Sequence, residues 1–175
     1  MQPGKTHELV KPLCWLLGTW KSVNVKLKRK LNLPMSDHCK LLKANAYDTY
    51  SEILTFSTFG HPTIKYEATS WHPKNFFPLK FEVGHFMCHP GKKNLTVVAA
   101  HNYGMAAVEV GKITQHCIEL CTLSMANSEV VDKPVVGYCR SYRINDQGQL
   151  VYKLKLRTQD EHSLKEYTRI IYEKD

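Results

Sequence analysis

Hydrophobic and polar residues alternate along most of the chain after residue 47. Between Ser51 and Thr58, for example, Leu54 and Phe56 occupy one parity and more polar residues occupy the other. This period of two predicts β-strands with one buried face. Together with the run at 19–28, the pattern predicts strands at 51–58, 63–71, 79–88, 95–101, 105–110, 117–124, 135–144, 149–157 and 167–173.

Three of these strands have further features. Gly84 lies inside the strand at 79–88, where a glycine suggests a bend or bulge. The strands at 95–101 and 105–110 consist almost entirely of apolar or small residues, so we expect both of their faces to be covered.

The stretch Pro12–Trp20 has a different pattern, with apolar residues at helical spacing. It predicts a short helix over about residues 10–17, ended by Gly18, which adopts a left-handed conformation without steric cost. The strand at 19–28 follows directly, with Trp20 as its first large inward side chain. This helix is expected to close one end of the structure, with Trp20 as the floor.

About ten short strands and no second helical region indicate a closed sandwich or barrel. A closed barrel of that size has room for one small ligand. The length of 175 residues suits one domain, which we expect over 10–175 after a flexible lead-in at 1–9.

Because the formal charge is +8, the distribution of the basic residues must be checked for a surface that would bind anionic partners such as nucleic acids. The basic residues cluster only at Lys26–Lys30, with Lys40 and Lys43 beyond, and elsewhere they alternate with apolar residues as on a solvated strand face. The sequence therefore carries no strong nucleic-acid signature. It also lacks an apolar run long enough to span a membrane and an N-terminal apolar signal region, which predicts an intracellular protein, cytoplasmic or nuclear. Assembly of the chain as a homodimer stays an open alternative.

The six cysteines include no CxxC pair, and in an intracellular protein we expect them to be reduced thiols. No common hydrolase, metalloprotease or phosphate-loop motif is present. Among the histidines, His85 and His89 would share a strand face with His101 nearby, but they would lie about 13 Å apart, too far to share a metal ion.

An ordered series of segments resembles the nitrobindin family, which also occurs as the C-terminal domain of a THAP zinc-finger protein. The segments are Pro12–Trp20, Tyr50–Phe56, Gly60–Tyr66, Thr69–Trp71, Pro78–Phe86 and Gly148–Tyr152. The resemblance implies an all-β fold, a ten-stranded antiparallel up-and-down barrel like those of lipocalins and fatty-acid-binding proteins, with a short N-terminal helix closing one end. It also implies heme b in the barrel, with the iron held by one histidine at the start of the last strand. In the family, the ferric heme binds nitric oxide and can isomerise peroxynitrite to nitrate.

The chain departs from the family pattern at functional positions. Ser22 and Asn24 replace two glycines of the opening motif, and Lys80 stands where the family has a pocket histidine. The family's iron-binding histidine falls on Tyr167, or on Glu166 if the preceding turn is one residue shorter. His162 is the histidine nearest to that position. The candidate ligand-binding residues are therefore Tyr167, His162, Lys80 and Trp20.

A tyrosinate is an iron ligand that suits ferric heme, as in catalase. Tyr167 is thus the candidate iron ligand, with His162 as the alternative, while an inward tyrosine that only fills a heme-free barrel is the competing interpretation. The leading hypothesis is a barrel that binds a planar or apolar ligand, including ferric heme with altered ligation. The alternative is a barrel without heme that carries lipids or small hydrophobic molecules, or that binds proteins through the basic 26–43 segment. The missing histidine leaves the family's enzymatic activity undecided for this chain.

Overall fold

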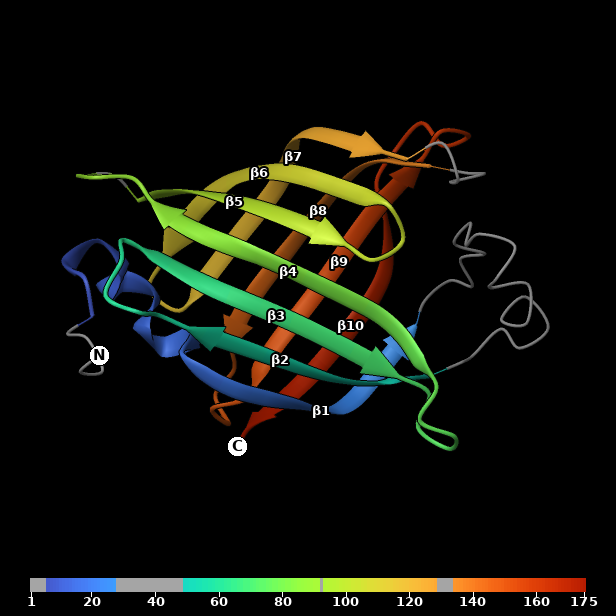
Figure 1. Ribbon diagram of the computed structural model, residues 1–175, viewed down its shortest axis with the longest axis horizontal. Coiled ribbons are helices and arrows are strands. Elements are labelled where there is room, and N and C mark those ends of the chain that lie inside the picture. Colours follow the sequence, from blue (N-terminus) through green and yellow to red (C-terminus); the bar gives the residue numbers. More distant parts are fainter. Residues whose placement is uncertain (1–5, 28–48, 92, 129–133) are drawn as a thin grey trace.

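The computed structural model describes residues 6–27, 49–91, 93–128 and 134–175, in which ten antiparallel strands form a closed barrel (Figure 1). Each strand pairs with its neighbour in sequence, and β1 closes the ring by pairing with β10. The elements are η1 (Glu8–Leu16), β1 (Gly18–Leu27), β2 (Ser51–Ser57), β3 (Thr63–Trp71), β4 (Pro78–Cys88), β5 (Asn94–His101), β6 (Met105–Thr114), β7 (Cys117–Asn127), β8 (Val135–Ile144), β9 (Leu150–Thr158) and β10 (Lys165–Lys174). The predicted ten-stranded up-and-down barrel is confirmed. Most of the basic 26–43 segment lies outside the described residues.

Alternation places every second residue in the barrel interior. In β2, Leu54 and Phe56 are each only 2% exposed, and the same parity is buried in β3. The expectation that the two central apolar strands are covered on both faces is wrong. Val98 in β5 and Val110 in β6 face outward and remain 45% and 40% exposed, because a single barrel wall has nothing packed against its outer side at these positions.

The helix at the start closes one end of the barrel, as expected, but it is a 3₁₀-helix. Pro12 lies inside it and has no backbone N–H to donate, which disfavours a regular α-helix. Its buried side chains are those of Val10, Leu13 and Leu16, and the Trp20 indole Nε1 donates to the Leu16 carbonyl oxygen at 2.7 Å. This hydrogen bond fixes the helix across the barrel end. Among the described residues, no helix is both long and apolar enough to cross a membrane.

Two apolar clusters fill the barrel at different heights. The larger cluster lies at the end that η1 closes, and around Tyr142 it includes Phe56 and Phe86 in edge-to-face contact. The smaller cluster lies at the opposite end, where the even-numbered strands begin, and this end is called the mouth below. The buried residues of the mouth cluster are Met105, Ala107, Val135, Tyr138 and Leu156, with Tyr103, Met125, Leu154 and Tyr167 packed against them.

The bend or bulge expected at Gly84 is not present. Gly84 instead lies at a point of close packing against another side chain. Pairing between β3 and β4 runs through Gly84 without a register shift, and the only shift in that pair of strands is between Ser70 and Trp71. A Cβ added to Gly84 would lie 2.3 Å from Tyr66 Cε1 and 2.5 Å from the Val98 carbonyl oxygen. The absent side chain therefore makes room for the Tyr66 ring.

Replacing Gly84 with alanine should lower the free energy of unfolding by about 2–3 kcal/mol, because the methyl group overpacks a closed interior. Gly137→Ala in β8 is the matched control, since a Cβ at Gly137 meets only Thr122 Oγ1, at 3.5 Å. Urea denaturation of both variants measures the difference. Equal stability of the two variants would contradict the packing role of Gly84.

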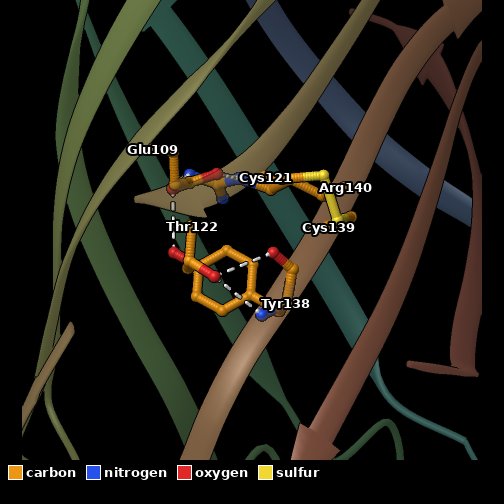
Figure 2. Close-up of a disulfide and its surroundings, with 6 residues drawn as sticks. All are labelled: Glu109, Cys121, Thr122, Tyr138, Cys139 and Arg140. Atoms are coloured by element: carbon orange, nitrogen blue, oxygen red, sulfur yellow. Dashed lines mark hydrogen bonds and ion pairs between the residues drawn. A yellow bond between two sulfur atoms is a disulfide. The ribbon is translucent and has the colours of Figure 1, made fainter. Parts of the chain in front are cut away.

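The expectation that all cysteines are reduced is wrong for one pair. Cys121 and Cys139 are directly opposite each other on β7 and β8 and form a disulfide (Figure 2). The register of paired residues between these strands ends at this pair. Beyond it, Thr122 Oγ1 accepts from the Tyr138 backbone N–H at 3.1 Å and donates to the Tyr138 carbonyl oxygen at 3.2 Å, so a side chain replaces the next backbone hydrogen bonds between the strands. The other cysteines in the described part of the chain, Cys14, Cys88 and Cys117, are free thiols.

Candidate ligand-binding site at the barrel mouth

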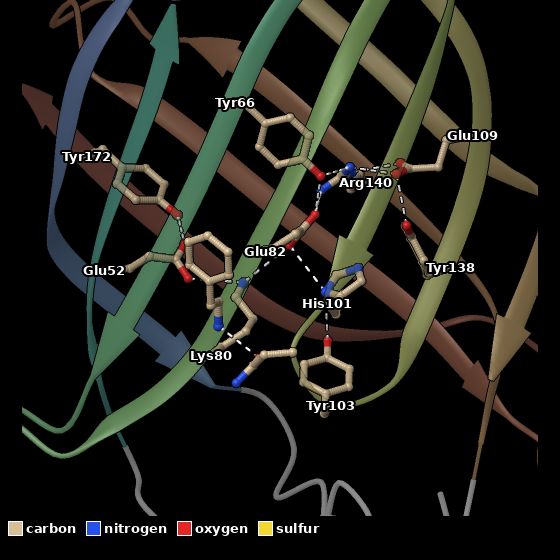
Figure 3. Close-up of polar contacts among 12 residues, drawn as sticks. Glu52, Tyr66, Lys80, Glu82, His101, Tyr103, Glu109, Tyr138, Arg140 and Tyr172 are labelled. Carbon is tan, nitrogen blue, oxygen red and sulfur yellow. Dashed lines mark hydrogen bonds and ion pairs between the residues drawn. The ribbon is translucent and has the colours of Figure 1, made fainter. Parts of the chain in front are cut away.

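A buried ion-pair network crosses the barrel between the two apolar clusters (Figure 3). Its centre is Arg140 on β8, whose side chain is 2% exposed. The guanidinium binds Glu109 of β6 through two nitrogens, with Nε at 2.7 Å and Nη2 at 2.5 Å, and binds Glu82 of β4 through Nη1 at 2.6 Å. The hydroxyl of Tyr66 donates to Glu82, and that of Tyr138 donates to Glu109 at 2.8 Å. The network therefore ties four strands together through fully engaged polar groups.

Lys80 extends the network toward the mouth. Its ammonium lies 3.0 Å from Glu52 Oε2 and 3.6 Å from Glu82 Oε2, and the hydroxyl of Tyr172 donates to the other oxygen of Glu52. The Lys80 side chain keeps 23% of its surface exposed, whereas those of Glu52 and Glu82 are nearly completely buried. Of these three charged side chains, only that of Lys80 is partly exposed to solvent.

The surroundings keep Glu82 and Lys80 charged. Burial alone would raise the pKa of Glu82, but Arg140, His101 and Lys80 hold it well below the usual range. Burial alone would lower the pKa of Lys80, and the neighbouring carboxylates of Glu52 and Glu82 raise it well above the usual value. Because Arg140 and Lys80 face Glu52, Glu82 and Glu109, the network has one more acidic than basic side chain.

Three tyrosines line the mouth above Lys80 and are only partly buried, although they belong to the barrel interior. They are Tyr50 just before β2, Tyr103 in the β5–β6 turn and Tyr167 near the start of β10. Burial raises the pKa of the Tyr167 hydroxyl, while the nearby Lys80 charge opposes that rise. Interior side chains that remain partly exposed border an accessible space, so the mouth is where a ligand can enter the barrel.

His101, the last residue of β5, has an unusual environment at the mouth (Figure 3). Its side chain is 6% exposed, and its Nδ1 lies 3.1 Å from the Tyr103 hydroxyl oxygen and 3.6 Å from Glu82 Oε2. The other ring nitrogen, Nε2, is buried without a hydrogen-bond partner. An open surface depression of about 410 Å³ also borders this residue, lined by Gly104, by 105–106 at the start of β6 and by 126–128 at the end of β7. An unpaired buried polar atom costs about 1–3 kcal/mol, so Nε2 is a locally unfavourable feature of the folded barrel.

The ionisation of His101 gives a test of its burial. Burial lowers the pKa of His101 to about 4, although Glu82 opposes the shift. The folded state therefore binds fewer protons than the unfolded state between about pH 6.5 and 4, and stability must fall as pH decreases through this window. Between pH 7 and 5, wild type should lose about 2 kcal/mol more stability than His101→Gln, as measured by urea denaturation without added ligand. Parallel pH profiles for the two proteins would contradict a buried, neutral imidazole.

The four candidate residues from the sequence lie in three different places. Lys80 and Tyr167 lie together at the mouth, close enough for the lysine charge to act on the phenol. Trp20 is buried at the opposite end, where it contacts η1 and the Lys174 ammonium. His162 is exposed in the turn before β10. Their roles in ligand binding stay predictions.

Sequence reasoning missed Arg140 as the centre of the interior network, and it weighed His101 only as a partner of surface histidines. A signal for Arg140 exists, since it lies between Tyr138 and Tyr142 on the same parity of one strand. A charged residue at an inward position between two aromatic residues needs a buried partner. Which strands provide the buried partner of Arg140, however, depends on how the barrel closes.

A closed antiparallel barrel with an apolar plug at one end and a polar, partly accessible mouth at the other belongs to the class of ligand-binding barrels. Within this class, the model of the THAP4-like, heme-binding β-barrel domain matches residues 9–174. The chain belongs to this family, the nitrobindins, and the family assignment made from the sequence is confirmed.

The curated relatives have related names. The human protein "Peroxynitrite isomerase THAP4" is 27% identical over 163 residues, which cover 90% of this chain and 25% of the relative. The Arabidopsis thaliana protein "Peroxynitrite isomerase Rv2717c" is 26% identical over 161 residues, covering 89% of this chain and 85% of the relative. This chain thus spans about a quarter of the length of the THAP4 relatives.

A solved structure has the same fold. The crystal structure of Rv2717c from M. tuberculosis superposes with a TM-score of 0.76, covering 98% of this chain and 99% of that one. At 22% sequence identity, this likeness supports the barrel architecture alone.

Proposed function

We propose that the chain binds ferric heme at the mouth of its barrel, with the Tyr167 phenolate as an iron ligand. Membership of a heme-binding family supports the cofactor. The observation that carries the proposal is the position of Tyr167, which is partly buried near the start of the last strand and packs against the apolar mouth cluster. A phenol in that position has an oxygen donor available at the accessible end of the barrel.

The residues of the mouth fit the chemistry of heme. The apolar mouth cluster suits a porphyrin face, and Tyr167 offers a phenol oxygen that can become an iron ligand by losing its proton. When bound, heme would supply an iron centre for coordinating small molecules. A negatively charged phenolate stabilises Fe³⁺ over Fe²⁺, so ferric heme is the expected form. Burial raises the pKa of the free Tyr167 phenol and the Lys80 ammonium opposes that rise, so coordination to iron would have to stabilise the phenolate.

The activity in the relatives' names is not part of this proposal. The resemblance places the family's iron-binding histidine at Tyr167, or at Glu166 if the preceding turn is one residue shorter, and a phenolate would change the electronic properties of the iron. Residence in the cytoplasm or nucleus and assembly as a homodimer also stay predictions.

A hemin titration followed by absorbance tests the proposal. Purified protein should give a saturable Soret band with one hemin per chain, and His162→Ala should leave the titration unchanged because that side chain is in solvent. Absence of a protein-dependent band with excess hemin would overturn the proposal. In that case, saturable binding of a fluorescent fatty-acid analogue would favour a carrier of apolar molecules.

A further inference from the structure

The line along which β7 and β8 lie side by side, called the β7–β8 seam below, changes at the Cys121–Cys139 disulfide. On the side of the closed end, the two strands are paired residue by residue, and this pairing stops at the disulfide. On the side of the mouth, β7 continues to Asn127 paired with β6, whereas β8 starts at Val135 paired with β9. The disulfide therefore lies where the paired half of the seam ends.

Side-chain contacts join the two strands in the mouth half of the seam. Thr122 Oγ1 binds both backbone groups of Tyr138, and Asn127 Nδ2 donates to the Val135 carbonyl oxygen at 3.1 Å. Both strands also contribute to the mouth cluster, β7 through Met125 and β8 through Val135 and Tyr138. A change in the spacing of the two strands here would therefore change the mouth.

The disulfide lies on the outer face of the barrel wall. The residues beside its two cysteines, Leu120 and Arg140, are buried in the interior, so the alternation of the strands points Cys121 and Cys139 outward. Cys121 is exposed and Cys139 is half-buried. Exposed disulfides are the ones that exchange readily with other thiols, because a thiolate must reach one of the two sulfur atoms.

We infer that the Cys121–Cys139 disulfide is a reversible thiol–disulfide exchange site, and that its reduction loosens the β7–β8 seam beside the mouth. The reductant is a dithiol. Its thiolate attacks Sγ of the exposed Cys121, the S–S bond breaks, and Cys139 leaves as a thiolate that takes up a proton. The second thiol of the reductant then attacks the mixed disulfide and releases Cys121 as a thiol. The cysteine pair gains two electrons and two protons, and the dithiol is oxidised to a disulfide.

The ion-pair network confines the change to the mouth half of the seam. Arg140 follows Cys139 directly and binds Glu109 of β6, so β8 stays attached from the inside to the strand beyond β7 (Figure 2). The residue pairs between β7 and β8 toward the closed end also remain. We therefore expect the reduced barrel to stay folded and to open only at 122–127 and 135–138. This inference is independent of heme and goes beyond the proposed function.

Hydrogen exchange followed by mass spectrometry tests the inference. The protein is labelled for seconds to minutes, a time that reports local opening, both oxidised and after reduction with dithiothreitol. Reduction should add two titratable thiols per chain. It should speed exchange in peptides from 122–127 and 135–138 by at least about tenfold, while peptides from β2 and β3 stay within about twofold. Reoxidation should restore slow exchange.

Two variants of β7 serve as matched probes. Cys117→Ser removes a free thiol from the same strand and should keep the full response to dithiothreitol. Cys121→Ser should exchange rapidly both before and after the treatment. If Cys121→Ser does not fold, as judged by circular dichroism, wild type reduced after folding carries the test.

Three results would each overturn the inference: no gain of thiols with dithiothreitol, unchanged exchange after reduction, or an equal increase in β2 and β3. The last result would show that the disulfide only stabilises the barrel as a whole. Because none of these measurements uses hemin, each result would leave the proposed function standing.

Discussion

Replacing Arg140 with methionine should lower the free energy of unfolding by about 3–5 kcal/mol, the largest loss of stability that we expect from one substitution. Methionine preserves much of the side-chain volume but removes every donor that Arg140 supplies to Glu82 and Glu109. Both carboxylates are buried, with side chains 3% and 0% exposed, so each would lose its main counter-charge. Removing one partner from a buried ion pair costs more than the pair itself contributes, because an uncompensated charge is left.

Urea denaturation at pH 7 measures this effect, and Arg143→Met is the matched control. Arg143 lies on the same strand, three residues further along, with its side chain facing solvent. Its replacement should change the stability by less than about 0.5 kcal/mol. A loss below about 1 kcal/mol for Arg140→Met would show that the buried network does not hold the four strands together.

Replacing Tyr167 with phenylalanine should weaken hemin binding by more than about tenfold. Even the residues that only support metal ligands change affinity by about 10–100-fold, so loss of a direct ligand should have at least that effect. Phenylalanine retains the ring that packs in the mouth cluster, so folding should be preserved. The measurement is an absorbance titration with hemin, in which the Soret band should also change position because the ligand has changed.

Tyr142→Phe provides the control for a tyrosine outside the mouth. Tyr142 is 1% exposed in the larger apolar cluster, in edge-to-face contact with Phe56 and Phe86. Its replacement should leave the hemin affinity within about twofold of wild type, since it contributes no atom to the mouth. Equal affinity of the Tyr167→Phe protein and wild type would remove Tyr167 from the site.

The fold was predictable because alternation and turn residues directly encode a meander of antiparallel strands. Leu54 and Phe56 are on the face of β2 that was predicted to be buried. Trp20 is buried against η1 at the closed end of the barrel, as predicted. The expectation that the outer faces of β5 and β6 are covered was wrong, because small apolar residues such as Ala106 are tolerated on an exposed strand face. Composition alone does not distinguish that situation from burial on both sides.

The candidate site was predictable only in part. Parity identifies an inward residue, but it does not say which inward residues of distant strands meet. Arg140 is 58 residues from Glu82 and 31 from Glu109, and only the closed ring brings them into contact. The Cys121–Cys139 disulfide has the same origin, since it depends on the register between β7 and β8. Among the histidines that the structure describes, His101 is the one with a buried ring nitrogen that lacks a hydrogen-bond partner, which a sequence does not record.

The crystal structure of the hemin-loaded protein tests the central claim most directly. The proposal predicts porphyrin density at the mouth, with the iron within bonding distance of the Tyr167 phenolate oxygen. Porphyrin bound on the outer surface, or beside Trp20 at the end closed by η1, would contradict it.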